Sequence, residues 1–185
     1  PQRIGLSATQ RPLDEVARYL AGDRPVEIAD AGSRKELDLK VIVPVEDLAK
    51  PDVSAYPMPD PQTAATGNEG HSSVWPAIYP KLLELVRSHR STLIFVNNRR
   101  LAERIALRVN ELAGEELLRA HHGSISHEQR VEIEERLKAG QLPGLVATSS
   151  LELGIDMGAV DVVVQVESPK SVARGLQRIG RAGHR

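Results

Sequence analysis

Apolar residues recur along the second half of the chain in two patterns, which predict helices and buried strands in alternation. Helical spacing predicts one helix at 77–89 and another from Arg99, whose apolar stripe is Leu101, Ile105, Val109 and Leu112. Continuous apolar runs, typical of strands buried on both faces, predict strands at 92–96, 144–148 and 160–166, and a short strand is predicted at 117–120. Such alternation requires right-handed crossovers, so we expect an α/β fold: a parallel sheet with helices on both faces.

Helix boundaries between these strands carry recognisable end signals. Ser126 followed three residues later by Gln129 is a capping-box pattern and predicts a helix start, which Gly140 then ends. A turn or short helix is expected at 151–154. Each of these signals agrees with the hydrophobic pattern around it.

The last stretch, 171–185, predicts a helix with two unlike faces. Val172, Leu176 and Ile179 fall on one side, which we expect to pack, and the opposite side carries Arg174, Gln177, Arg178 and Arg181. No Asp or Glu occurs between Lys170 and Arg185. We therefore expect the arginine face to lack an acidic partner within the domain, with Arg181 pointing into a solvent-filled cleft.

The first third of the chain is less regular. A helix is predicted at 12–20, with Pro12 in its first turn and Gly22 at its end, and strands are predicted at 26–28 and 39–45. Residues 47–75 are rich in Pro, Ser and Gly and predict a loop or insertion, followed by Trp75 as a packing anchor. We expect 1–24 to be a connector and 25–185 to be one domain.

Composition excludes several classes of function. Net charge is −1, so any affinity for nucleic acid must come from local clusters of basic residues. The chain has no cysteine, which excludes disulfides and removes the usual zinc ligands. Zinc held by His121, His122 and His127 is disfavoured because no carboxylate or thiol completes the set, and no metal site is predicted. No apolar run has membrane-spanning length, and a cytoplasmic location is expected.

Phosphate-type donors follow three of the predicted strands. Because the carboxyl ends of parallel strands meet at one edge of the sheet, these residues are candidates for one binding surface. Contacts to phosphate and sugar would position a strand of nucleic acid without reading its sequence. The competing interpretation is that they are ordinary turn residues and buried structural histidines. The candidates are Asn97, Asn98, Arg99, His122, Gly123, Ser124, Thr148 and Ser149.

The C-terminal sequence QRIGRAGHR resembles the last motif of superfamily 2 helicases, and its Gly-His-Arg ending is most similar to the Lhr (large helicase-related) family. Upstream segments resemble other motifs of these enzymes in the family's order: Ser7-Ala8-Thr9, which couples the two motor domains, and Gly154 with Asp156, which reach the nucleotide. The resemblance implies a RecA-like fold, in particular the second motor domain of an ATP-dependent DNA helicase. It implies single-stranded DNA as partner, with RNA or a hybrid duplex as alternatives.

The same resemblance assigns roles to the last motif. Gln177, Arg178, Arg181 and Arg185 would act in catalysis, with Arg181 as the arginine finger that stabilises charge on the γ-phosphate. Arg181 would also contact the nucleotide, and either His184 or Arg185 would be the second finger. ATP and Mg²⁺ would be held mainly by a first RecA-like domain.

An absence in the sequence limits what these 185 residues can do alone. No glycine is followed by lysine, so the chain has no P-loop, and we expect half of a motor with no ATPase of its own. Two other classes stay open: a non-catalytic nucleic-acid-binding module that kept the fold, and an unrelated nucleotide-binding α/β enzyme. The second lacks support because no predicted strand is followed by Gly-x-Gly-x-x-Gly.

Overall fold

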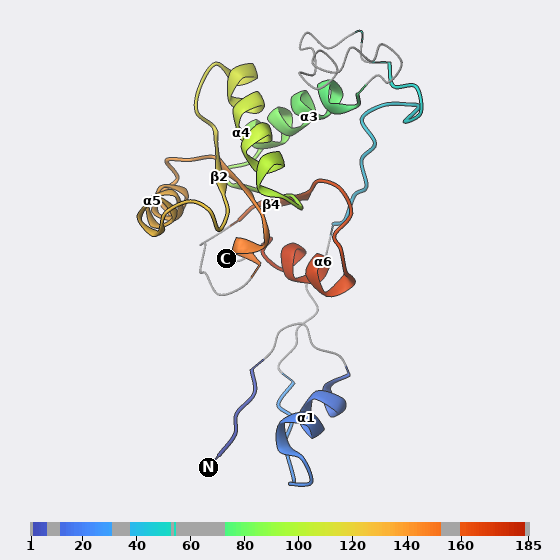
Figure 1. Ribbon diagram of the computed structural model, residues 1–185, viewed down its shortest axis with the longest axis vertical. Helices are drawn as coiled ribbons and strands as arrows, with labels where there is room; N and C mark the ends of the chain where they lie inside the picture. The colour runs from blue at the N-terminus through green and yellow to red at the C-terminus, as the bar shows by residue number, and fades with distance from the viewer. Residues whose placement is uncertain are drawn as a thin grey trace. The chain divides into compact units, whose positions relative to one another are not determined.

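The computed structural model describes residues 2–6, 12–30, 38–52, 54, 73–152 and 160–183. Contacts within the chain divide it into two units, Pro1–Val41 and Ile42–Arg185, and Figure 1 shows the elements of both. The predicted limit between connector and domain, at residues 24 and 25, stays a prediction.

The first unit holds one helix, α1 (Leu13–Ala21). Pro12 is its N-cap, and Gly22 ends it with φ 66°, a conformation that glycine adopts without steric cost. Arg3 Nη1 donates a hydrogen bond to the Leu20 carbonyl (2.9 Å). The predicted helix is therefore confirmed to within one residue at each end.

The second unit is built around a parallel sheet of four strands in the order β2-β3-β1-β4. The strands are β1 (Thr92–Phe95), β2 (Leu118–His121), β3 (Gly144–Ala147) and β4 (Val162–Gln165). All neighbouring pairs are parallel, which confirms the predicted α/β fold.

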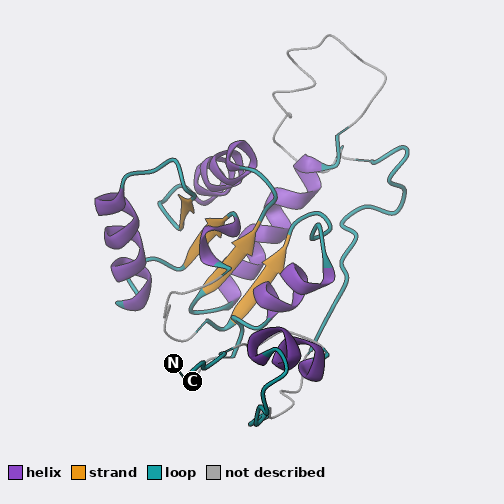
Figure 2. Ribbon diagram, turned by 60° about the horizontal axis from the view of Figure 1, so that its bottom comes forward, coloured by secondary structure: helices purple, strands orange, loops and turns teal. Residues whose placement is uncertain are grey.

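Helices cover both faces of this sheet (Figure 2). On one face, Ile94 and Val96 pack with apolar residues of α3 (Trp75–Ser88) and α4 (Arg99–Ala113). On the other face, Leu93 and Phe95 pack with α5 (His127–Lys138) and with Leu151 of the short 3₁₀-helix η1 (Ser149–Leu151). Because side chains alternate along β1, this strand contributes residues to two separate hydrophobic cores, one on each face of the sheet.

Helix ends in this unit follow the signals in the sequence. Asn98 Oδ1 accepts a hydrogen bond from the Leu101 amide (2.9 Å) at the start of α4, and Gly114 ends that helix with φ 73°. The capping box of α5 is complete, since Ser126 Oγ accepts from the Gln129 amide and Gln129 Oε1 accepts from the Ser126 amide.

The predicted strands at 26–28 and 39–45 are wrong. Residues 25–30 and 38–45 lie outside any helix or strand, and the apolar side chains Leu39, Val41 and Val43 are exposed. β-branched residues favour strands through packing and pairing with neighbours, and the described part of the chain offers these residues no strand partner.

Two burial predictions near the C-terminus are also wrong. β4 is a half-buried edge strand and not a strand covered on both faces. The last helix, α6 (Val172–Ile179), is shorter than 171–185 and exposes Val172 (80%) and Leu176 (47%). The buried residues of α6 are Gly175 and Arg178, because Gly175 approaches Pro169 and Arg178 has an acidic partner inside the domain.

Candidate nucleic-acid and nucleotide interface

The carboxyl ends of the four strands lie side by side. Phe95, at the end of β1, is in register with Ala147 of β3 and Gln165 of β4, and Ala147 is in register with His121 of β2. The loops that carry the predicted donors therefore leave the sheet at one edge. Of the predicted donors that follow β1, β2 and β3, five are exposed: Asn98, Arg99, Gly123, Ser124 and Ser149.

The loops after β1 and β2 are directly joined. Arg99 Nη1 donates a hydrogen bond to Ser124 Oγ (3.0 Å), and both residues are exposed. Because a guanidinium has five N–H donors, this contact leaves Arg99 with donors for further acceptors. The structure thus brings these two predicted residues together, whereas the Asn98 side-chain oxygen Oδ1 caps α4.

Asn97 has a different environment from the other donors. Its Nδ2 donates to Glu167 Oε2 and to the Ser168 carbonyl (both 3.1 Å), and its Oδ1 accepts from Arg178 Nη1 (3.5 Å). Glu167 has φ 65°, an uncommon conformation for a non-glycine residue. The side chain of Asn97 therefore holds a strained turn after β4, and both its amide protons are used within the domain.

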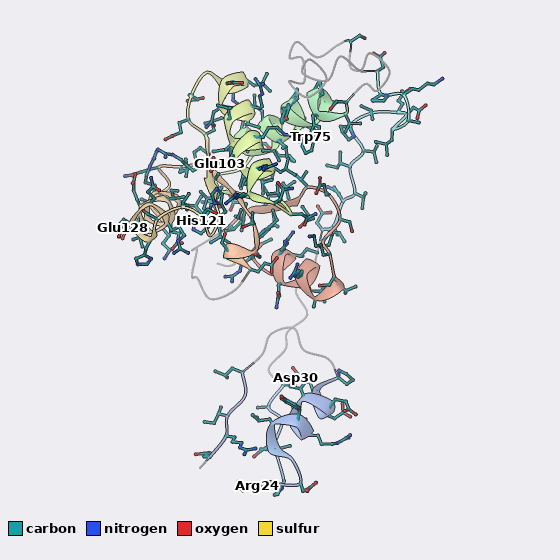
Figure 3. All side chains as sticks on the ribbon, viewed as in Figure 1. Arg24, Asp30, Trp75, Glu103, His121 and Glu128 are labelled. Carbon is teal, nitrogen blue, oxygen red and sulfur yellow. The ribbon has the colours of Figure 1, made fainter. Side chains whose placement is uncertain are left out.

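The two adjacent histidines at the end of β2 are buried and bonded. His121 Nε2 contacts Glu134 Oε1 (2.9 Å) on α5, and its Nδ1 contacts Ser150 Oγ (2.9 Å) in η1. Burial lowers the pKa of His121, and the carboxylate of Glu134 opposes that shift. Figure 3 labels His121 near the centre of the second unit.

His122 is tied to the opposite face of the sheet. The Nδ1 atom of His122 accepts a hydrogen bond from the Ser124 amide (3.3 Å), so its Nε2 carries the proton. Nε2 donates to Glu103 Oε1 (2.7 Å) on α4, and Figure 3 labels Glu103. The His122 side chain therefore shapes the loop that presents Gly123 and Ser124. Thr148, at the end of β3, donates its backbone N–H to the His121 carbonyl (3.2 Å).

Arg178 and Glu152 form a buried ion pair that the sequence did not predict. Arg178 Nε and Nη2 both donate to Glu152 Oε1, at 2.9 and 2.6 Å, and Arg178 Nη1 donates to Gln165 Oε1 (2.7 Å). The guanidinium also lies 5.1 Å from the centre of the Phe95 ring. The expectation that the arginine face lacks an acidic partner is therefore wrong.

Arg181 lies one turn after Arg178, beyond the end of α6. It is half-buried, and its Nη2 donates to the backbone carbonyl of Glu152 (3.0 Å), so it does not point into an empty cleft. Gln177, the remaining predicted catalytic residue that the structure describes, is half-buried on α6. The predicted residues Ser7, Ala8, Thr9, Gly154, Asp156 and Arg185 lie outside the described residues.

Neither a metal site nor a membrane span is found among the described residues. No group of three or more His, Asp or Glu side chains there could hold a metal ion. No helix in the same ranges is long and apolar enough to cross a membrane.

A four-stranded parallel sheet with helices on both faces and an arginine-bearing helix near its carboxyl edge is the arrangement of a RecA-like domain. The family described as "Helicase conserved C-terminal domain" matches residues 77–185. A "Lhr helicase/ probable uracil glycosylase" of Mycolicibacterium smegmatis is 44% identical over 99% of the chain, which covers 13% of that protein. An "ATP-dependent helicase Lhr-Core" of Saccharolobus solfataricus is 46% identical over 98% of the chain and 20% of its own length.

Solved structures that match this chain are also those of helicases. The helicase Lhr of Mycobacterium smegmatis, bound to ssDNA and AMP-PNP, matches 97% of this chain and 22% of its own, with 50% identity and a TM-score of 0.81. The DUF1998 helicase MrfA bound to DNA matches 60% of this chain and 16% of its own, with 32% identity and a TM-score of 0.55. The chain belongs to the helicase C-terminal domain family and, within it, to the Lhr helicases of superfamily 2. It spans between 13% and 20% of the length of the two curated relatives.

Proposed function

We propose that this chain is the second motor domain of an ATP-dependent DNA helicase or translocase. The observation that carries the proposal is the Arg99–Ser124 hydrogen bond (3.0 Å), which joins the start of α4, directly after β1, to the loop after β2 at the carboxyl edge of the sheet. The related M. smegmatis helicase was solved with ssDNA and AMP-PNP. The ligands of this relative support a site for single-stranded DNA and a site for nucleotide in this chain.

Single-stranded DNA would lie along the exposed donors at this edge. Arg99 and Ser124 would contact phosphates through side-chain donors, and Gly123 would let backbone amides approach closely because it has no side chain. Thr148 and Ser149 would add donors from the loop after β3. Asn97 and His122 would hold these loops in position through the bonds described above. Such contacts hold a strand without selecting its sequence.

Arg181, which follows α6, would contact the nucleotide. ATP would supply the terminal phosphate bond whose hydrolysis drives movement, with Mg²⁺ held mainly by a first motor domain. The donor set fits a phosphate, because a guanidinium presents paired N–H groups and stays charged at biological pH. Gln177 on α6 and Arg185, Gly154 and Asp156, which lie outside the described residues, would complete the nucleotide contacts by family resemblance.

The test is Arg181→Ala in the full-length helicase that carries this chain. Loss of an arginine finger costs about a thousandfold or more in turnover, so DNA-stimulated ATP hydrolysis should fall by that order. The matched control is Arg174→Ala, which removes an exposed arginine from the same helix and should leave the rate near wild type.

Melting temperature and DNA affinity are measured alongside the rate. Near-wild-type hydrolysis by a folded Arg181→Ala protein would contradict the proposal. If that variant also binds DNA normally, the non-catalytic nucleic-acid-binding module becomes the better account.

A further inference from the structure

We infer that Glu152 is a positioning residue for ATP hydrolysis, which it serves by holding Arg178 and Arg181 of the last motif. The inference rests on the proposed function of Arg181. One carboxylate oxygen of Glu152 accepts two hydrogen bonds from Arg178, and the backbone carbonyl of Glu152 accepts one from Arg181. A single residue thus contacts both guanidinium groups.

Burial restricts the positions that the Glu152 and Arg178 side chains can take. Glu152 is 8% exposed and Arg178 is 3% exposed, so water has little access to either side chain. Hydrogen bonds between charged groups are short and strong, and the Nη2 to Oε1 distance of 2.6 Å agrees with that. Leaving a buried carboxylate without its partner lowers the stability of the fold, so the folded state keeps the two side chains together.

The remaining contacts of Arg178 extend this hold to the sheet. Its Nη1 donates to Gln165 Oε1 (2.7 Å) at the end of β4, and its guanidinium lies over Phe95 at the end of β1. Arg178 therefore fastens α6 to the carboxyl edge of two strands. Its donors are used inside the domain, so we assign it, too, a positioning role.

Arg181 is placed as a consequence. Its backbone N–H donates to the Arg178 carbonyl (3.1 Å), and its side chain donates to the Glu152 carbonyl (3.0 Å). Glu152 also follows η1 directly, and η1 begins at Ser149, one of the proposed DNA contacts. The segment that would contact DNA is thus continuous in the chain with the residue that orients the arginine finger.

The experiment uses the full-length helicase with Glu152→Gln, which keeps the shape of the side chain and removes its charge. Misplacing a catalytic group by about 1 Å can cost a hundredfold in rate, so kcat should fall by about that factor while the KM for ATP and the affinity for DNA stay near wild type. Glu132→Gln, an exposed change of the same kind on α5, is the control and should leave kcat unchanged.

A double-mutant cycle separates positioning from general stability. If Glu152 acts through Arg181, adding Glu152→Gln to Arg181→Ala should lower kcat little further; a merely structural role predicts additive losses. Glu152→Asp keeps the charge with a shorter reach and should have an intermediate kcat, and it takes the place of Glu152→Gln if that variant does not fold. Wild-type kcat in either folded variant, or additive losses, would overturn the inference. Wild-type kcat in Arg181→Ala alone would overturn the proposed function instead.

Discussion

Arg178 and Glu152 are both charged and both nearly withdrawn from water, a combination that is costly unless the two groups satisfy each other. Here Arg178 Nη2 lies 2.6 Å from Glu152 Oε1, and Gln165 Oε1 accepts a further hydrogen bond from the arginine. Replacing such a pair with apolar residues is often neutral for stability, so packing alone gives no reason for charges at this place. Orientation of the neighbouring Arg181 provides one.

His121 leads to a prediction about acid stability. Burial lowers its pKa in the folded chain below the ordinary value of 6.5, with Glu134 opposing and Arg130 and His122 adding to the decrease. Between the folded and the ordinary pKa, the unfolded chain binds more protons than the folded chain at His121. The contribution of His121 to the free energy of unfolding should therefore be complete above pH 6.5 and be lost as pH falls toward the folded pKa.

The measurement is urea unfolding of wild type and His121→Asn between pH 5 and 8. The variant should be less stable at pH 8, because the contacts with Glu134 and Ser150 are lost, and its stability should depend less on pH in this range. Equal pH dependence in the two proteins would show that other groups cause the acid loss.

Sequence reasoning at this scale identified residue types but not their partners. Asn98, Arg99 and Ser124 could be selected because each follows an apolar run that predicts a strand. The burial of Arg178 could not be predicted, because its partner lies 26 positions away in the sequence and helical periodicity carries no information about such pairs. A charged residue within an apolar segment, such as Glu152 beside Leu151, was the one available signal.

Among elements, the helices and strands of the second unit follow the hydrophobic pattern closely. Alternation of short apolar runs with helical stripes identified all four strands of the described sheet. The rule that strands covered on both faces are continuously apolar holds for the two inner strands, β1 and β3, which are fully buried. The strand expected at 39–45 shows the limit of this reasoning. Its residues have the composition of a strand, but a strand forms only where a neighbour accepts its hydrogen bonds, and sequence pattern does not identify the neighbour.

The capping box of α5 gives a prediction at the same scale. Ser126→Ala removes the hydroxyl that accepts from the Gln129 amide (3.2 Å), so the free energy of unfolding should fall by about 1 kcal/mol. Urea unfolding measures the change. Glu135→Gln, an exposed substitution on the same helix, is the comparison and should change stability by less than about 0.5 kcal/mol. Equal effects of the two substitutions would mean that the box adds nothing to stability.

At the scale of the molecule, function depends on where charge lies and not on how much there is. Net charge is −1, so the proposed DNA binding would have no long-range attraction from the whole chain and would come from the donors at the carboxyl edge of the sheet. The parallel topology accounts for their proximity, since it brings the loops after β1, β2 and β3 to one side. The position of these loops after predicted parallel strands indicated their role in binding phosphate, and the sheet register supplies their adjacency.

The last prediction is that the chain binds single-stranded DNA weakly, with little sequence preference and strong dependence on salt. Each phosphate contact releases condensed counterions, so log K should fall linearly with log salt, by about 0.7 per contact on a single strand. Arg99→Ala should lower the affinity and reduce that slope by about 0.7. The matched control is Arg87→Ala, which removes the same charge near the end of α3, the helix that precedes the opposite end of β1. Fluorescence anisotropy at several salt concentrations measures both quantities. Tight binding that ignores salt, a strong preference for one base sequence, or equal slopes for the two variants would each show that DNA does not lie along this edge.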